Sequence, residues 1–317
     1  MNGLLDVIRA ETFKVLRKRR MYILAALYWV ILPVLALIVG RLLDTNLADS
    51  FANEGASVDM LLQSLFSPYG LAGVSLVLPA YASPTLYIVA VALLAALLIG
   101  DERSQQMWKT VLVVQPNRVA VLSGKIIVCM LAILALMAGA FLSSVIFGSL
   151  GTTFLPTDFS GDWLRLAWLY LLQWAFLLAP VVLAFLLIFV VRSAVLGIVM
   201  VLFLPGLIEG IYTVLNTLLQ LQPLNRINAI FQTLRLQRAW EEAPRYFFTA
   251  NLYVPGRSPG TEFMTQLIPE GDDFNESIFV GMLGSGIDLA HAAAVMAGYA
   301  IVIGALLYWA FLRRDVD

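Results

Sequence analysis

The sequence predicts an all-α integral membrane protein with six transmembrane helices. Hydrophobic residues make up 61% of the 317 residues and charged residues only 13%, about half the ~25% that is typical of soluble domains. The mean hydropathy is +0.87. Six long apolar runs are separated by more polar stretches, and a run of ~20 apolar residues is long enough to cross the hydrocarbon core of a bilayer. The lysines support one orientation, because all of them fall on the side predicted to be cytoplasmic: Lys14, Lys18, Lys109 and Lys125.

Residues 1–20 are predicted to form a basic amphipathic helix that precedes the first span. Apolar and basic side chains alternate there with helical spacing, and the cluster Arg17-Lys18-Arg19-Arg20 comes just before the apolar run. Such a cluster places that end of the chain in the cytoplasm. A signal peptide is the competing interpretation. We reject it because the apolar run that follows is long and no small-residue cleavage site closes it.

The six predicted spans leave two stretches on the outer side that are longer than a turn. Residues 41–83 are acidic, and their apolar part, 60–82, contains Pro68 and Pro79, which predict a broken, interfacial or re-entrant helix there. Residues 216–287 form the largest segment outside the membrane and contain several Pro-Gly pairs. Both termini are then expected on the cytoplasmic side. The predicted spans are Met21–Gly40, Pro84–Gly100, Lys125–Leu150, Leu164–Val191, Ala194–Leu215 and Asp288–Leu312.

The fifth predicted span contains Pro205, Gly206 and, in its outer half, Glu209. An acidic residue inside a membrane span is costly and is by default a functional candidate. The alternative is that Glu209 lies near the outer interface, where a helix broken at Pro205-Gly206 would offer free backbone groups for hydrogen bonds. The sequence favours this alternative, because a proline followed by glycine disrupts a helix.

A polar, charged stretch between the second and third spans predicts a short amphipathic helix over about residues 101–116. Its acidic residues lie in the first turn, where the helix dipole favours negative charge, and Pro116 ends it. One face of this helix is apolar and needs a partner. That face either rests on lipid headgroups or on its own bundle, or it docks into a groove of another, soluble subunit; its residues are Met107, Trp108, Val111 and Leu112.

Several functions are excluded or disfavoured by what the chain lacks. Gly124-Lys125 is followed by Ile126 and has no glycine five residues earlier, so it is not a phosphate-binding loop. A single histidine cannot build a typical zinc site, and Gly284-Ser285-Gly286 does not have the spacing of a nucleophile elbow. A net charge of −1 argues against a nucleic-acid partner, and one cysteine excludes an internal disulfide. We therefore expect no catalytic residue, no metal and no cofactor bound by this chain.

Two motifs together resemble the ABC-2-type permeases, the membrane subunits of ABC exporters. The residues Glu11, Lys14 and Arg17 match the E-x-x-K-x-x-R pattern of that family's amphipathic elbow helix. The charged stretch is similar to the family's coupling segment, which begins with glutamate and ends in a lysine that opens the next span. Its matching residues are Glu102, Lys109, Leu112, Arg118 and Lys125. The chain departs from the pattern at Gln106-Met107, Val111 and Asn117.

The resemblance implies a domain layout and a set of partners. It implies a cytoplasmic elbow helix over 1–20 and a six-helix permease domain over 21–317, with a coupling helix at about 101–116 and an extracytoplasmic segment at about 216–287. The ATPase site, with ATP and Mg, would lie on a separate ABC ATPase subunit. Membrane lipids and a second permease copy or a paralogue would be the other partners, in a bacterial inner membrane or a plasma membrane.

The same resemblance assigns expected roles to the residues singled out above. The coupling residues would be Glu102, Met107, Trp108, Lys109, Val111, Leu112 and Arg118, and the gate candidates Pro205, Gly206 and Glu209. Because the spans are apolar, the cargo is expected to be amphiphilic, such as an antibiotic, a lipid or a peptide. A membrane scaffold that recruits a partner without transport is the alternative. A secondary transporter ranks last, because it needs charges near the midplane.

Overall fold

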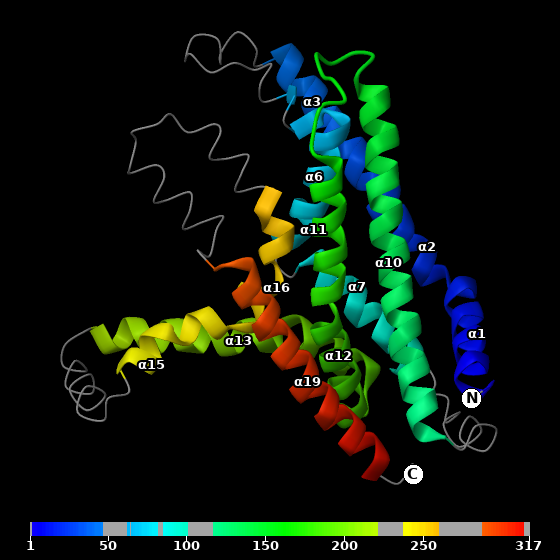
Figure 1. The fold of residues 1–317 in the computed structure, drawn as a ribbon, viewed down its shortest axis with the longest axis vertical. Helices are drawn as coiled ribbons and strands as arrows, with labels where there is room; N and C mark the ends of the chain where they lie inside the picture. Colours follow the sequence, from blue (N-terminus) through cyan, green and yellow to red (C-terminus); the bar gives the residue numbers. More distant parts are fainter. Residues whose placement is uncertain are drawn as a thin grey trace.

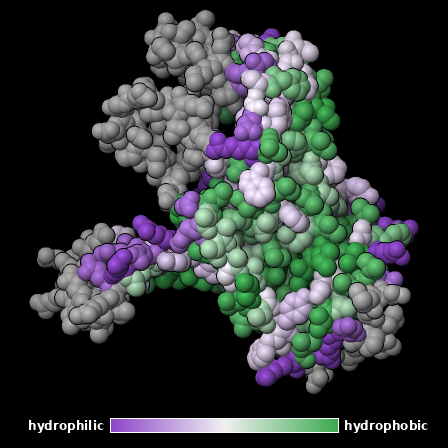
Figure 2. Space-filling model, in the orientation of Figure 1, coloured by the Kyte–Doolittle hydropathy of each residue, from purple (hydrophilic) through white to green (hydrophobic). Residues whose placement is uncertain are grey.

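The computed structural model describes residues 2–46, 62–63, 65–81, 85–100, 117–220, 237–259 and 287–313, and every regular element within them is helical. The helices form one elongated bundle, and both ends of the chain lie at the same end of it (Figure 1). The surface is largely hydrophobic along the side of the bundle that Figure 2 shows. Hydrophilic residues gather near its ends and on the part that projects sideways from it, where Figure 1 labels α15 (Gln237–Glu242). Such a surface is what a lipid-embedded bundle requires.

Five helices among the described residues are long and apolar enough to cross a membrane. Their lengths run from 25 to 34 residues, beyond the ~20 that the hydrocarbon core requires. They correspond to the first, third, fourth, fifth and sixth predicted spans. These helices are α2–η1–α3 over Arg19–Thr45, α10 over Arg118–Gly151, α11–α12 over Trp163–Val191, α13 over Ala194–Leu219 and α19 over Leu289–Arg313.

The predicted second span, Pro84–Gly100, is a helix that begins at Leu86 and is shorter than the hydrocarbon core. It consists of α7 (Leu86–Ala95, 10 residues) and the π-helical turn η2 (Ala96–Gly100, 5 residues). At 1.5 Å per residue it measures roughly 22 Å, less than the ~30 Å hydrocarbon core. Nearly all its side chains are buried against other helices. A sixth helix of spanning length is therefore not present among the described residues.

Helix α6 (Pro68–Tyr81) confirms part of the prediction for residues 60–82, because the chain bends at Ser67 just before Pro68 and α6 is too short to count among the spanning helices. The predicted break at Pro79 is wrong. Pro68 is the first residue of α6, where a proline needs no hydrogen-bond partner for its nitrogen. Pro79 lies inside the helix without ending it. Leu71, Ala72 and Leu76 are fully buried, so α6 packs into the bundle as a short apolar helix.

The N-terminal helix is also shorter than predicted. α1 runs from Asn2 to Arg17 and ends there because Lys18 adopts an extended backbone (φ −84°, ψ 127°). The next helix, α2 (Arg19–Ala26), continues through the π-helical turn η1 (Leu27–Ile31) into α3 (Leu32–Asn46). Arg19 and Arg20 therefore belong to the first span, and the chain turns a corner at Lys18.

Helix α10 is the longest helix described and contacts most of the others. Asn117 caps it by accepting a hydrogen bond from the Ala120 N–H at 3.1 Å. Glycines on α10 allow neighbouring elements to come close: a Cβ at Gly124 would lie 2.6 Å from Val7 of α1, and one at Gly148 would lie 2.5 Å from the Cα of Pro68. These contacts place α1 and α6 directly against α10.

Helix α13 (Ala194–Gln220) follows α12 (Leu178–Val191) after a two-residue turn at Arg192-Ser193, in which Arg192 takes a left-handed conformation (φ 63°). α13 leaves the bundle sideways (Figure 1). It passes through Pro205 without ending, so the predicted break at Pro205-Gly206 is wrong. Neighbouring groups can compensate a lost backbone hydrogen bond in an apolar helix.

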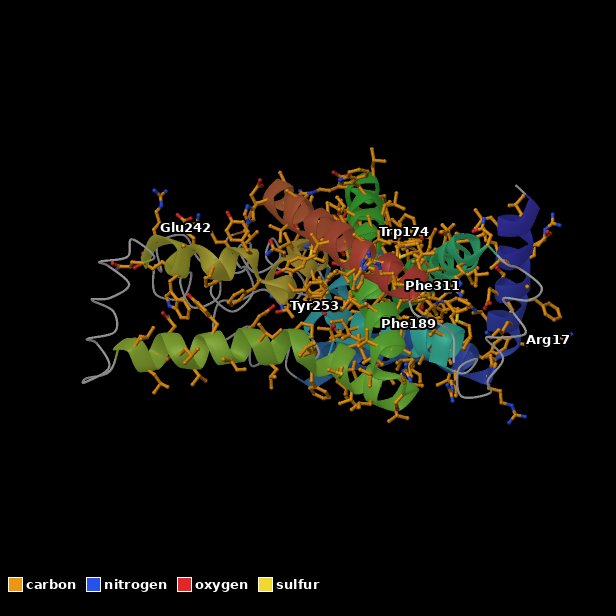
Figure 3. The ribbon with its side chains drawn as sticks, turned by 90° about the horizontal axis from the view of Figure 1, so that it is seen from below. Arg17, Trp174, Phe189, Glu242, Tyr253 and Phe311 are labelled. Atoms are coloured by element: carbon orange, nitrogen blue, oxygen red, sulfur yellow. The ribbon has the colours of Figure 1, made fainter. Side chains whose placement is uncertain are left out.

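Among the described residues, α13 is followed by the short helical elements α15 (Gln237–Glu242), η3 (Ala243–Tyr246) and α16 (Phe248–Leu252), and residues 254–259 are also helical. These elements lie in the predicted extracytoplasmic segment. We refer to residues 237–259 as the inserted segment, because Leu252 and Tyr253 within it are fully buried in the bundle. Figure 3 shows Tyr253 near the centre of the helices, whereas Glu242 lies away from the centre, on the side where α13 and α15 project from the bundle.

Candidate functional site

A buried ion pair joins the N-terminal helix to α10. The Lys125 ammonium lies 2.5 Å from the carboxylate of Glu11. Lys125 is fully buried, and Glu11 is only 7% exposed. The ammonium also donates a hydrogen bond to the carbonyl oxygen of Leu98 at 3.0 Å. We call this set of residues, Glu11, Lys125 and Leu98, the inner junction.

The local sequence explains how this pair forms. Gly124 has no side chain, so Val7 of α1 packs against the backbone of α10 at that point. This brings α1 close enough for Glu11, one turn further along, to reach Lys125. Lys14 supports the same carboxylate from within α1, with its ammonium 3.4 Å from the second oxygen of Glu11. The Gly124-Lys125 dipeptide therefore joins two helices.

The energetic consequence is that neither charge can be removed alone without a large cost. Burying a charge is expensive unless it is paired and hydrogen-bonded. Here the ammonium has both a carboxylate and a carbonyl oxygen as partners. Breaking such a pair from one side typically costs about 3–5 kcal/mol, because the other charge stays buried without its partner.

The inner junction joins the two helices that flank the predicted coupling segment. Leu98 is in η2, which ends at Gly100, and Lys125 is two turns into α10, which begins at Arg118. The stretch between them, 101–116, lies outside the described residues. The two helices that flank this stretch, η2 and α10, are thus joined to each other and to α1 through the Lys125 ammonium group. At this end of the bundle Arg118 also donates to the Leu312 carbonyl oxygen of α19, at 3.4 Å.

The structure brings some of the predicted residues together and separates others. Glu11 is in the inner junction and Lys14 contacts its carboxylate. Arg17 is exposed, lies over the ring of Phe13 at 4.1 Å and points away from the bundle (Figure 3). Arg118 begins α10. The remaining predicted coupling residues lie outside the described residues: Glu102, Met107, Trp108, Lys109, Val111 and Leu112.

Of the gate candidates on α13, Glu209 makes a second polar contact, near the middle of that helix. The Glu209 carboxylate accepts a hydrogen bond from the Thr249 N–H at 2.8 Å and another from the Thr249 hydroxyl. The prediction that Glu209 would bond backbone freed by a helix break is therefore wrong, since its partner is the inserted segment. Pro205 is buried and Gly206 is exposed. We call the Glu209–Thr249 contact the outer latch.

A third polar contact, which sequence reasoning missed, holds the inserted segment from α11. Gln173 is fully buried. Its amide nitrogen donates to the Leu252 carbonyl oxygen at 3.0 Å, and its amide oxygen accepts from the Gly256 N–H at 2.9 Å. A buried amide in an otherwise apolar span was the one available signal. Its backbone partners 79 and 83 positions away leave no trace in the local pattern.

The described residues contain no group of three or more His, Cys, Asp or Glu side chains that could hold a metal ion. Within the same part of the chain Cys129 is a buried free thiol. The chemistry that the arrangement offers is therefore that of charged and polar contacts between helices. Such contacts fix how helices move relative to one another.

The chain was compared with models of protein families, with curated proteins and with solved structures. The profile of a family described as ABC-2 family transporter protein matches residues 7–206, more than half of the chain. The match covers most of α1, the inner junction and the first half of α13. A search of curated proteins and a search of solved structures found no match.

Proposed function

The chain belongs to the ABC-2 family of transporter proteins, and on that basis we propose that it is the permease subunit of an ATP-driven exporter. ATP would be hydrolysed, with Mg, on a separate ABC ATPase subunit that binds at the cytoplasmic face. Two permease chains, identical or paralogous, would form the translocation pathway between them. The cargo would be an amphiphilic molecule such as an antibiotic, a lipid or a peptide.

The observation that carries this proposal is the inner junction. A transport subunit driven from outside the membrane needs a place where a push on a cytoplasmic segment reaches the spans. Lys125 ties together α1, the end of η2 and the start of α10. A force applied to residues 101–116 would therefore act on three elements at once, since the helices on both sides of that stretch and α1 are joined by the same buried charge.

The coupling step follows from the apolar face predicted on residues 101–116. Met107, Trp108, Val111 and Leu112 would enter a groove of the ATPase subunit, as an amphipathic helix does in helix-in-groove recognition. When two ATPase subunits close on ATP, the groove would carry this helix with it. Coupling of this kind requires an element with two positions that both sites bias.

The cargo class rests on composition and on the surface of the helices. The helices expose many large apolar side chains, such as Phe203, Ile208 and Ile301, and these suit contact with lipid or with the apolar part of an amphiphile. In the described residues the charged side chains of the spans are few. This composition disfavours a small hydrophilic ion as the cargo.

The experiment that tests the proposal compares two variants of the coupling segment. Trp108→Asp places a charge on the apolar face, and Gln106→Asp places the same charge on the opposite face of the same predicted helix. We expect Trp108→Asp to abolish co-purification of the ATPase subunit and its ATP hydrolysis while membrane insertion is unchanged. Gln106→Asp should retain both. If both variants retain the ATPase equally, the apolar face is not the docking site.

A further inference from the structure

The inserted segment is held from three sides. From α11, Gln173 holds the backbone at Leu252 and Gly256. From the N-terminal end of α7, the Thr85 hydroxyl pairs with the Tyr253 hydroxyl. These contacts are deep in the bundle, and the segment itself reaches inward between α11 and α19 (Figure 1). The part of the segment around Leu252 is therefore anchored to the core of the bundle.

The side that faces α19 is also tied to that helix. The Tyr299 hydroxyl donates to the Tyr246 carbonyl oxygen at 2.9 Å, and the His291 ring lies against that of Tyr246 with centroids 5.2 Å apart. Phe248 is buried and meets Tyr299 edge to face at 5.2 Å. These contacts connect η3 and the start of α16 to α19.

The side that faces α13 is held by the outer latch and its neighbours. Glu209 accepts from Thr249, and Tyr212, one turn further, donates from its hydroxyl to the Trp240 carbonyl oxygen at 2.6 Å. The Tyr212 ring meets the Phe247 ring edge to face at 5.0 Å. All of these contacts come from less than two turns of α13.

The N-terminal end of α13 lies against the end of η2, the element that contains Leu98 of the inner junction. A Cβ on Gly100, the last described residue before 101–116, would lie 2.6 Å from the Cβ of Ala194, the first residue of α13. Between Ala194 and Glu209 one face of α13 is buried at Val201 and Pro205, and the other face is uncovered, with Phe203, Leu207 and Ile208 exposed. The helix does not break at Pro205, so it rises about 22 Å from Ala194 to Glu209.

We propose that α13 is the mechanical link between the ATPase side and the inserted segment, with Glu209 and Thr249 as the contact that opens. This inference rests on the proposed function, because it needs an ATPase subunit to displace the chain at Gly100, which lies against the first residue of α13. A displacement of Ala194 would tilt α13 and pull Glu209 away from Thr249. The inserted segment would stay with α11 and α19.

Burial decides which of the contacts opens. Gln173 is fully buried, so losing its partners would leave its amide and two backbone groups unsatisfied, which costs the full desolvation penalty of each group. Glu209 and Thr249 are only half-buried. Water can replace their hydrogen bonds when they separate, so the net loss is smaller than at Gln173.

Cross-linking on the purified complex with its ATPase tests this link. In a Cys129→Ala background, one variant carries Glu209→Cys with Thr249→Cys across the outer latch. The matched control carries Tyr246→Cys with His291→Cys, which joins the same inserted segment to α19. A short bifunctional thiol reagent is applied without nucleotide and with Mg-ATP and vanadate, and the rate of cross-linking is measured together with ATP hydrolysis.

We expect nucleotide to slow cross-linking of the 209–249 pair several-fold and to leave the 246–291 pair unchanged. Equal rates for the 209–249 pair in both conditions overturn the link, and so does equal slowing of both pairs, since the whole segment then moves. If Glu209→Cys does not fold, Tyr212→Cys with Phe247→Cys reports on the same contact. Hydrolysis with unchanged cross-linking overturns the link alone, whereas absence of an ATPase subunit overturns the proposed function together with it.

Discussion

The Lys125 ammonium and the Glu11 carboxylate lie 2.5 Å apart although 114 positions separate them in the chain. The first residue is in a long membrane helix and the second in a helix that precedes all the spans. A buried pair of this kind fixes the N-terminal helix in one position against α10. It also makes a sharp test of how the cytoplasmic end of the bundle is held together.

Replacing either partner of this pair should destabilise the protein strongly. We expect Lys125→Met and Glu11→Gln each to cost about 3–5 kcal/mol, because the remaining charge or acceptor stays buried without its partner. The double variant should recover much of that loss. Lys14→Met is the matched control, since Lys14 contacts the same carboxylate from a partly exposed position, where an ion pair contributes about 0–1 kcal/mol.

Unfolding measured in mild detergent for these four variants checks the prediction. If Lys125→Met unfolds at the same temperature as Lys14→Met, the pair does not hold the junction together. If the double variant is as unstable as the sum of the single variants, the two residues do not act as a pair.

A methyl group at Gly148 should disturb the contact between α10 and α6. The added Cβ would lie 2.5 Å from the Cα of Pro68, which is backbone and cannot rotate away. We expect Gly148→Ala to cost about 1–3 kcal/mol, as overpacking of a core does. Gly298→Ala is the matched control, because nothing lies within 4 Å of its added Cβ and alanine is favoured over glycine in a helix by about 0.5–1 kcal/mol.

Thermal unfolding of the two glycine variants distinguishes them if this packing is correct. Gly148→Ala should unfold at a lower temperature than the unmodified protein, and Gly298→Ala at the same or a slightly higher one. A Gly148→Ala protein as stable as the control would show that α6 does not press against α10 at Pro68.

The loop between α10 and α11 should contribute a pH-dependent stabilisation. The Ser160 hydroxyl and the Ser160 N–H donate to Asp158 and lower the pKa of its carboxyl below the usual range, with a smaller contribution from Gln63. Since the folded pKa is the lower one, the stabilisation is present above the unfolded pKa of about 3.9 and is lost as the pH falls through the folded pKa.

Comparing the unmodified protein with Asp158→Ala between pH 7 and pH 3 tests that assignment. The unmodified protein should unfold at a higher temperature at pH 7, and the difference should shrink below about pH 4, where the unfolded carboxyl begins to bind a proton. A difference that is constant over the whole range would mean that the charge of Asp158 plays no part.

The sequence predicted the apolar helices well, because composition and length alone identify them. The predicted second span, Pro84–Gly100, differs by only two residues from the helix found, Leu86–Gly100, but that helix is too short to count among the spanning ones. Pro79 and Pro205 misled the prediction. Each lies inside a helix that continues, because packing against neighbours can outweigh one missing backbone hydrogen bond.

The contacts that form the two sites were less accessible from the sequence. Glu11 and Lys125 each matched a motif, but nothing in either motif says that they touch. The partners of Gln173 are backbone groups, and the main partner of Glu209 is a threonine in a segment whose position depends on three helices. Side chains that bond distant backbone leave no periodic signal, so only the folded arrangement reveals them.

The most direct test of the central claim is to solubilise the tagged chain gently and identify by mass spectrometry what co-purifies with it. If the chain is the permease subunit of an ATP-driven exporter, a soluble subunit that carries a phosphate-binding loop will be recovered, and the complex will hydrolyse ATP. Recovery of the chain alone, or with a partner that lacks such a loop, would contradict this account and favour a membrane scaffold without transport.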